Sequence, residues 1–203
     1  LSVTVARGKV QVRPFAADRS GFALGEGAAF LVLESAAHAR ARGARGHARI
    51  AGWGLSCDAT HLTKPDCAGQ ARALAAALRR ADLAPREVGY CNAHGTATRI
   101  GDVVECEALA QVFGGALDGL AVSSTKALHG HLLGAAGALE AAVTVLALAR
   151  GALPPNMHAE AADPACRVRL VAPGATAAPQ LAAALSSSFA FGGTNAVLAF
   201  TRA

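Results

Sequence analysis

Short apolar runs alternate with helix-like segments along most of this chain of 203 residues. The apolar runs lie at 48–55, 88–92 and 120–123, and the helix-like segments lie at 70–81, 102–113 and 134–149. Three further apolar runs, at 168–171, 181–187 and 196–200, close the chain without helices between them. Alternating strands and helices fold into a sheet with helices on its faces, and closing strands of this kind form hairpins. The sequence therefore predicts an α/β protein with a mixed sheet.

The segment before this alternation predicts one more strand and a short helix. Residues 22–34 begin with glycines and continue as Ala-Ala-Phe-Leu-Val-Leu, which is typical of a strand buried on both faces. Ser35 is a good N-cap for a helix over 36–42, and Gly43 follows where that helix should end. Residues 1–20 are expected to form irregular connections and short strands.

The composition indicates a core-rich globular protein rather than a disordered one. Hydrophobic residues make up 53% of the chain and charged residues 16%. The net charge is +5, with arginines gathered at 40–49 and at Arg72, Arg79 and Arg80. We expect most of these arginines to be solvated surface and some to attract an acidic partner. Aromatic residues make up only 4%, which argues against base stacking and hence against a nucleic-acid partner.

The cysteines predict neither a disulfide framework nor a metal site. Their number is odd, and no two form a C-x-x-C pair. They are Cys57, Cys67, Cys91, Cys106 and Cys166. This usage fits a reducing cytoplasm, and no signal peptide is evident at the N-terminus. The long apolar run that ends near 149 contains Glu140, so we expect a buried helix rather than a membrane span.

Two histidines are the leading candidates for chemistry. His94 and His131 each follow a short apolar run that predicts a strand, at a point where a helix should begin. Loops at strand ends carry the sites of open α/β sheets. Gly95 permits close backbone approach beside His94, and Lys126 precedes His131 by five residues. Two imidazoles with a lysine nearby suit the stabilisation of an enolate.

Three acidic residues are expected to support this site rather than to react. Glu140 lies in a helix that is predicted to be buried, so its charge needs a partner. Lys126 and the pair Asp102 and Glu105 are the candidates. We interpret these groups as an ion-pair network that fixes the positions of the lysine and the histidines.

A series of spaced motifs spans almost the whole chain. They are Arg13-Pro14-Phe15, Gly21-Phe22-Ala23-Leu24-Gly25-Glu26-Gly27, His94-Gly95-Thr96-Ala97-Thr98, Ser124-Thr125-Lys126, Gly130-His131-Leu132-Leu133-Gly134-Ala135-Ala136-Gly137 and Phe189-Ala190-Phe191-Gly192-Gly193-Thr194-Asn195. In this order they resemble the C-terminal half of a β-ketoacyl-[acyl-carrier-protein] synthase of the discrete, type II kind. The resemblance implies the layered αβαβα architecture of the thiolase-like superfamily. It also implies that residues 1–46 end the N-terminal half and that 47–203 form the C-terminal domain.

The resemblance further implies a decarboxylative Claisen condensation of malonyl carrier protein with an acyl thioester, in fatty acid or polyketide synthesis. His94, His131 and Lys126 match the catalytic positions. Thr96 and Thr98 match positions that bind the phosphopantetheine arm of acyl carrier protein, which is the substrate carrier; no covalently bound cofactor or metal is implied. Phe191, Gly192 and Gly193 match the gating loop, where the Phe191 N–H contributes to an oxyanion hole. A loop that binds nucleotide phosphate is disfavoured, because the loop contains no lysine.

The family's nucleophilic cysteine belongs to a helix N-terminus upstream of Arg13-Pro14-Phe15, and none of the five cysteines matches it. We therefore expect an N-terminal half as partner, besides acyl carrier protein, in a cytoplasmic homodimer or heterodimer. Two alternatives stay open: a non-condensing subunit like a chain-length factor, and a non-catalytic assembly fragment. The chain also departs from the family pattern, with Ala190 for glycine, Ser187 for asparagine, Ala16 for aspartate and His129 for a small or polar residue.

Overall fold

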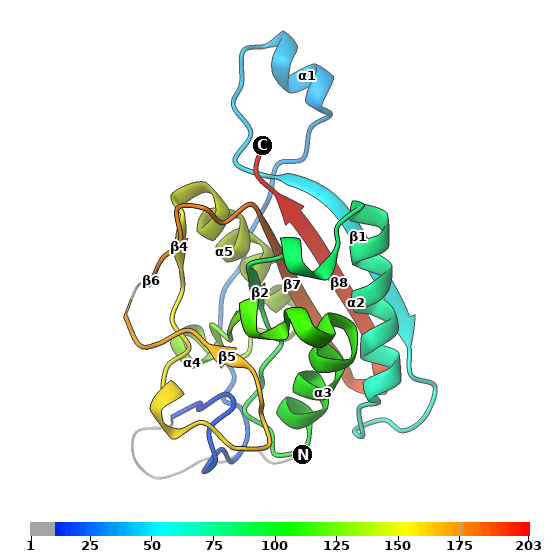
Figure 1. Cartoon of the computed structure of the whole chain (residues 1–203), viewed down its shortest axis with the longest axis vertical. Coiled ribbons are helices and arrows are strands. Elements are labelled where there is room, and N and C mark those ends of the chain that lie inside the picture. The colour runs from blue at the N-terminus through cyan, green and yellow to red at the C-terminus, as the bar shows by residue number, and fades with distance from the viewer. Residues whose placement is uncertain (1–10, 175) are drawn as a thin grey trace.

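A six-stranded sheet forms the centre of the protein, with its strands in the order β1-β8-β7-β2-β3-β5 (Figure 1). The computed structural model describes residues 11–174 and 176–203. The strands of this sheet are β1 (Arg49–Cys57), β2 (Tyr90–Asn92), β3 (Ala121–Ser123), β5 (Arg169–Leu170), β7 (Ala183–Phe189) and β8 (Thr194–Thr201). β8 runs antiparallel to both of its neighbours, and the other adjacent pairs are parallel. This confirms the predicted mixed sheet. β4 (Ala152–Leu153) and β6 (Thr176–Ala177) pair separately.

The helices fall close to the predicted segments. Among the described residues, the α-helices are α1 (Ala36–Ala41), α2 (Cys67–Ala81), α3 (Gly101–Phe113), α4 (Lys126–His129) and α5 (Ala136–Arg150). Ser35 caps α1 as expected, accepting a hydrogen bond from the His38 N–H. α2 begins three residues before the prediction because the Asp66 carboxylate accepts hydrogen bonds from the backbone N–H groups of Ala68 and Gly69. The four-residue α4 is too short to produce a periodic sequence pattern, and it was missed.

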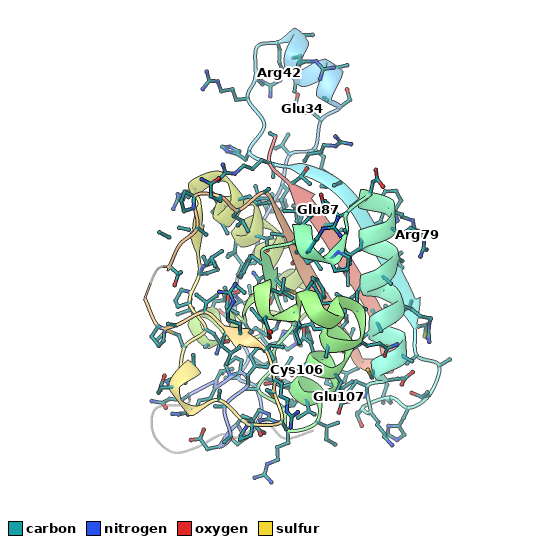
Figure 2. All side chains as sticks on the ribbon, viewed as in Figure 1. Glu34, Arg42, Arg79, Glu87, Cys106 and Glu107 are labelled. Carbon is teal, nitrogen blue, oxygen red and sulfur yellow. The ribbon has the colours of Figure 1, made fainter. Side chains whose placement is uncertain are left out.

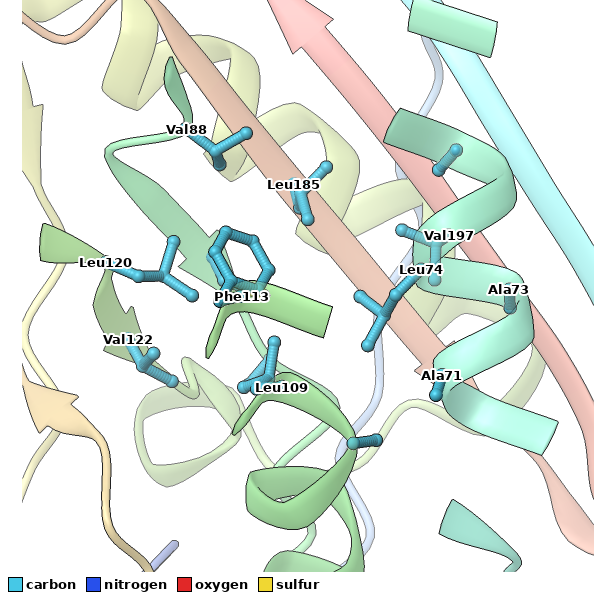
Figure 3. Packing of buried hydrophobic residues seen from close by; sticks show 14 of the residues in the cluster. Ala71, Ala73, Leu74, Val88, Leu109, Phe113, Leu120, Val122, Leu185 and Val197 are labelled. Atoms are coloured by element: carbon cyan, nitrogen blue, oxygen red, sulfur yellow. The ribbon is translucent and has the colours of Figure 1, made fainter. Parts of the chain in front are cut away.

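The core formed by the described residues consists of two hydrophobic clusters, one on each face of the sheet. Leu185 of β7 belongs to the cluster under α2 and α3, whereas its neighbour Ala184 belongs to the cluster under α5. Alternate residues of a strand point to opposite faces, so the sheet is covered by helices on both sides. Figure 3 shows the first cluster, in which Leu74 of α2 and Leu109 of α3 point toward Leu185.

Helix α2 lies directly against β1, and a glycine makes this possible. A Cβ atom built on Gly54 would lie 1.8 Å from the carbonyl oxygen of Ala73 in α2. No side chain fits there without moving the helix. This close approach seats the middle of α2 directly on β1.

Within the described residues, the prediction of a buried strand at 22–34 is wrong. Leu24 forms an isolated parallel bridge with His131, and residues 28–34 are extended without a paired strand among the described residues. Phe30 is 92% exposed and Val32 is 89% exposed. The apolar sequence is typical of a buried strand, but a strand needs neighbours, and the described part of the chain places none beside it. The following segment with α1 projects from the body, and Glu34 forms an ion pair with Arg42 there (Figures 1 and 2).

Helix α5, expected to be a buried helix, is buried on one face only. Glu140, Thr144 and Leu148 are buried, whereas Leu146 is exposed. By length and composition alone, Leu133–Arg150 could cross a membrane, and a third of that window (33%) is buried in the structure. The helix packs against β7, and the buried charge of Glu140 has a partner described below.

Candidate active site

Three loops meet at one edge of the sheet. β2, β3 and β7 are parallel neighbours, so their carboxyl ends lie side by side. The loop after β2 contains His94, the segment after β3 contains Lys126 and His131, and the loop after β7 contains Phe191. The sequence correctly placed each histidine after a strand. Neither begins a helix directly: α3 starts only at Gly101, and the short α4 precedes His131.

The two imidazoles contact each other. The ring centroids of His94 and His131 are 5.4 Å apart, and the ring planes meet at 83°. Phe22 packs edge-on against His131, and Phe189 packs edge-on against His94. Aromatic rings therefore flank the imidazole pair on two sides and reduce its contact with water.

The contacts of His94 determine its tautomer. The Nζ of Lys126 lies 3.4 Å from Nδ1 of His94. An ammonium group can only donate, so Nδ1 must be the acceptor and the neutral ring carries its proton on Nε2. Burial, followed by the positive charge of Lys126, holds the pKa of His94 well below its usual value. His94 is therefore a neutral N–H donor near pH 7.

His131 is also a neutral ring with its proton on Nε2, but a different contact fixes its tautomer. The backbone N–H of Leu133 donates to Nδ1 of His131 over 3.3 Å, which leaves the proton of the neutral ring on Nε2. Burial and then the charge of Lys126 lower the pKa of His131 to about 4. Both rings thus present an Nε2–H donor, as the interpretation of an enolate site requires.

Lys126 and Glu140 form a buried ion pair beneath the histidines. Both side chains are fully buried, and Nζ of Lys126 lies 2.5 Å from Oε1 of Glu140. Nζ also donates to the backbone oxygen of His94. Burial raises the pKa of Glu140, and Lys126 opposes that rise. The pair confirms the predicted partner of Glu140 and ties α5 to the His94 loop.

Asp102 and Glu105 hold backbone groups rather than the lysine. Glu105 accepts hydrogen bonds from the N–H groups of His94 and Gly95, each at 2.8 Å. Asp102 accepts one from the Phe15 N–H at 2.7 Å. Burial raises the pKa of Glu105 to about 7 and that of Asp102 to about 6, against the opposing effect of these hydrogen bonds. Glu105 thus holds the His94 loop through the backbone, whereas Asp102 also lies 3.9 Å from Nε of the buried Arg19 guanidinium.

Arg19 is a supporting residue that the sequence analysis missed. Its buried guanidinium pairs with Asp163 at 2.5 Å and donates to the backbone oxygens of Thr98 and Arg99. It therefore holds the loop that presents Thr98. Arg19 follows the Arg13-Pro14-Phe15 motif closely in sequence, but its partners lie at 98, 99 and 163, and local sequence could not reveal them.

The glycine-rich loop after β7 is tied to the loop after β1. The N–H of Gly192 donates to the Leu62 oxygen, and the N–H of Asp58 donates to the Gly193 oxygen. Asn195 donates to the Asp58 carboxylate at 2.6 Å. Asp58 and Asn195 were not predicted as site residues; a polar residue directly after a strand was the available signal for Asp58.

Phe191 and Ala190 both belong to the glycine-rich loop after β7. Phe191 is 53% exposed, and its backbone N–H has no hydrogen-bond partner among the described residues. Ala190, which stands where the family has glycine, adopts an ordinary extended conformation with φ of −96°. The structure therefore places no backbone strain at Ala190.

His129 is a third imidazole near the site, and its nitrogens are both engaged. Nδ1 lies 2.7 Å from the Gly130 oxygen, and Nε2 lies 2.9 Å from the Thr125 hydroxyl. Its side chain therefore closes the short turn between Lys126 and His131. Burial lowers the pKa of His129.

A cavity of about 850 Å³ opens over the imidazole pair. His94 and His131 line it, together with Thr96, Thr98 and Phe191. The structure thus brings together the predicted imidazole, hydroxyl and gating positions. Lys126 and Glu140 lie behind the histidines and do not line it. Among the described residues, no three His, Cys, Asp or Glu side chains group as a metal ion would require.

None of the five cysteines lines this cavity. Cys91, Cys106 and Cys166 are buried, and burial raises the pKa of the Cys91 thiol to about 12. Cys106 lies within α3 (Figure 2). This confirms that Cys91 and Cys106 serve as small buried groups.

The chain is similar to known proteins over nearly its whole length. Residues 47–160 match the family described as β-ketoacyl synthase, C-terminal domain. Among curated proteins, it is 46% identical to 3-oxoacyl-[acyl-carrier-protein] synthase 2 of Synechocystis sp., with 94% of this chain and 46% of that protein covered. It is 47% identical to nodulation protein E of Rhizobium sp., with 93% and 46% covered. The chain thus spans about half the length of these relatives.

Solved structures agree with this assignment. The ishigamide ketosynthase/chain length factor superposes with a TM-score of 0.93 at 40% identity, covering 100% of this chain and 48% of that one. A β-ketoacyl synthase from Burkholderia phymatum gives 0.88 at 43% identity, covering 94% and 46%. The thiolase-like fold expected from the motifs is therefore confirmed. The chain belongs to the β-ketoacyl synthase family and contains its C-terminal domain.

Proposed function

We propose that this chain is the C-terminal part of a 3-oxoacyl-[acyl-carrier-protein] synthase that condenses malonyl carrier protein with an acyl thioester. The pair of neutral imidazoles, each with its Nε2–H free for a ligand, is the observation that carries the proposal. The reaction serves fatty acid or polyketide synthesis. We also propose a cytoplasmic location for the protein.

The imidazoles would act where negative charge develops. When the bond between the malonyl α-carbon and its carboxylate breaks, carbon dioxide leaves and the electron pair forms an enolate on the thioester. The Nε2–H groups of His94 and His131 donate to that oxygen. The enolate carbon then attacks the acyl carbonyl, and the cysteine thiolate leaves. Donors already oriented toward developing charge contribute about 3 kcal/mol each, or roughly a hundredfold in rate.

Other residues would hold the two substrates. The hydroxyls of Thr96 and Thr98, 3.1 Å apart at the cavity wall, would bind the phosphopantetheine arm of acyl carrier protein. The unpaired N–H of Phe191 would contribute to the oxyanion hole of the acyl thioester. Gly192 and Gly193 have φ near +80°, which gives the loop turns that few other residues adopt. Lys126 would keep both rings neutral and His94 in the required tautomer.

An N-terminal half would supply the nucleophilic cysteine and cover the exposed apolar surface. Phe30 and Val32 lie in an extended segment with unpaired backbone, as expected of a strand that completes another sheet. We therefore propose that residues 1–46 belong to that half and 47–203 to the C-terminal domain. The family match, which begins at residue 47, supports this boundary. The assembled enzyme would be a homodimer or heterodimer that receives acyl carrier protein.

A non-condensing subunit resembling a chain-length factor is the second candidate. Solved structures similar to this chain include a ketosynthase in complex with its chain length factor from Xenorhabdus doucetiae. The complete donor pair, with Lys126 and Glu140 intact behind it, favours the condensing role, because a subunit that only shapes the product has no need of two oriented donors.

The test is His94→Ala in the chain assembled with an N-terminal half that carries the cysteine. Malonyl decarboxylation should fall at least a hundredfold, while acyl transfer to the cysteine stays measurable. His38→Ala, which removes an exposed imidazole from α1, serves as the matched control and should change neither step. Unchanged decarboxylation in His94→Ala would refute the proposed role.

A further inference from the structure

A second hollow lies where α2 meets the edge strand β1, and the proposed function gives it no task. Arg72, Arg79 and Arg80 of α2 line it, together with Leu55 and Cys57 of β1. Its volume is about 580 Å³, and it shares no lining residue with the cavity over the imidazoles. It is therefore a groove separate from the active site.

The three arginines lie on one face of α2. Arg72 and Arg79 are seven residues apart, which is about two helical turns, and Arg80 follows directly. Ala75 and Ala76 occupy the turn between them and line the same groove. Because alanine side chains are short, they leave an apolar depression between the guanidinium groups.

Strand β1 holds two of the guanidinium groups in place. Arg72 donates to the Cys57 oxygen over 3.1 Å, and Arg80 donates to the Trp53 oxygen over 2.8 Å. The Arg80 guanidinium also lies 5.2 Å from the centre of the Trp53 ring. A guanidinium group has several N–H donors, so each anchored group keeps donors for a ligand. An arginine that is already held loses less side-chain entropy when it binds.

The third arginine has no anchor. Arg79 extends from α2 into solvent (Figure 2). It forms no hydrogen bond or ion pair within the described ranges. Its whole guanidinium group is therefore open to a ligand.

No acid among the described residues neutralises this groove. None lines it, and α2 contains none between Cys67 and Ala81. Asp66 caps the start of α2, where its carboxylate accepts from two backbone N–H groups, and Asp82 caps the end. All three arginines are exposed, so their charge is available to an anion from outside the chain.

The groove suits a carboxylate-bearing polypeptide better than a nucleic acid. A guanidinium group binds a carboxylate through two parallel hydrogen bonds. Leu55, which is 67% exposed, and the two alanines add an apolar surface against which an apolar side chain can pack. A phosphate backbone would use the arginines but leave this apolar surface uncovered.

We propose that the groove between α2 and β1 binds an acidic segment of a partner protein. Carboxylates pair with Arg72, Arg79 and Arg80, and an apolar side chain packs against Leu55. The carrier protein must reach the other cavity to deliver its substrate, so the partner in this groove is a different protein. The inference does not depend on the condensing role.

The test measures the fluorescence anisotropy of a labelled peptide of glutamate and leucine residues, added to the chain assembled with its N-terminal half. The same peptide with glutamine in place of glutamate is the reference. The wild-type complex should bind the glutamate peptide about tenfold more tightly, as three exposed ion pairs permit, and added salt should reduce this preference.

Two variants locate the binding. Arg72→Gln/Arg79→Gln/Arg80→Gln should lose the preference. Arg79→Gln alone removes no contact within the described chain, so it keeps the fold and should weaken binding of the glutamate peptide about threefold. Arg167→Gln is the matched control: this exposed cation precedes β5, at the opposite edge of the sheet, and its loss should change neither affinity.

Equal wild-type affinities for the two peptides, or a preference that survives in the triple variant, would overturn the proposal. The KM for malonyl carrier protein should be the same in the triple variant as in the wild type. A raised KM would mean that the carrier protein itself uses the groove, which would overturn the assignment to a different partner. Single-stranded DNA that binds more tightly than the glutamate peptide, and is lost in the triple variant, would overturn the choice of a polypeptide.

Discussion

Lys126 and Glu140 should show strong energetic coupling. Lys126→Met leaves the Glu140 carboxylate buried without its cation, and Glu140→Leu leaves the ammonium buried without its anion. Removing one partner of a buried pair costs about 3–5 kcal/mol, so the two single variants together sum to about 6–10 kcal/mol. The double variant removes both charges and leaves mainly the His94 backbone oxygen without its donor, which costs about 1–3 kcal/mol. The loss of unfolding free energy in the double variant should therefore be smaller than the summed losses of the two single variants by at least about 3 kcal/mol.

Urea unfolding of the four proteins at pH 7, followed by circular dichroism, measures this coupling. The exposed pair Glu34 and Arg42 provides a parallel cycle in the same chain and should show no resolvable coupling. Additive losses at Lys126 and Glu140 would refute the reasoning, because they would mean that neither charge depends on the other.

Three further predictions concern packing, pH and assembly. Gly54→Ala should cost more than about 3 kcal/mol in unfolding free energy, because the added methyl group meets the α2 backbone. The control Gly43→Ala, where space is open but φ is +70°, should cost about 1–2 kcal/mol. Equal losses in the two variants would contradict this prediction. The depressed pKa of His131 contributes stability that is present above pH 6.5 and is lost as pH falls through about 4. The difference in unfolding free energy between wild type and His131→Asn should therefore shrink over that range. A pH-independent difference in urea unfolding would argue against this prediction. Phe30→Ser should weaken assembly with the N-terminal half in analytical ultracentrifugation while leaving the chain's own unfolding free energy unchanged; undiminished assembly would show that this segment is not the contact.

Local sequence predicted the elements well where their periodicity is strong. The segments at 70–81 and 102–113 became α2 and α3 with shifts of three residues or fewer, because apolar spacing and capping are local properties. The segment at 28–33 failed for the opposite reason. Its composition is typical of a buried strand, but burial depends on neighbouring strands that local sequence does not specify.

The site was predictable in its residues but not in its connections. The motifs indicated His94, His131 and Lys126. Glu140, which pairs with Lys126, was one of the three acidic residues predicted to support the site. The bonds that fix the site join distant segments: Glu105 to the backbone of His94, Arg19 to the backbone of Thr98. Such contacts follow from the packing of α3 and the N-terminal segment against the loop after β2, and no spacing in the sequence encodes them.

The protonation of the two imidazoles tests the account most directly. Histidine ¹⁵N chemical shifts distinguish the two neutral tautomers and the cation. At pH 7, both His94 and His131 should be neutral with the proton on Nε2. A proton on Nδ1 of either ring, or a cationic ring, would contradict the claim that both donate to one enolate oxygen.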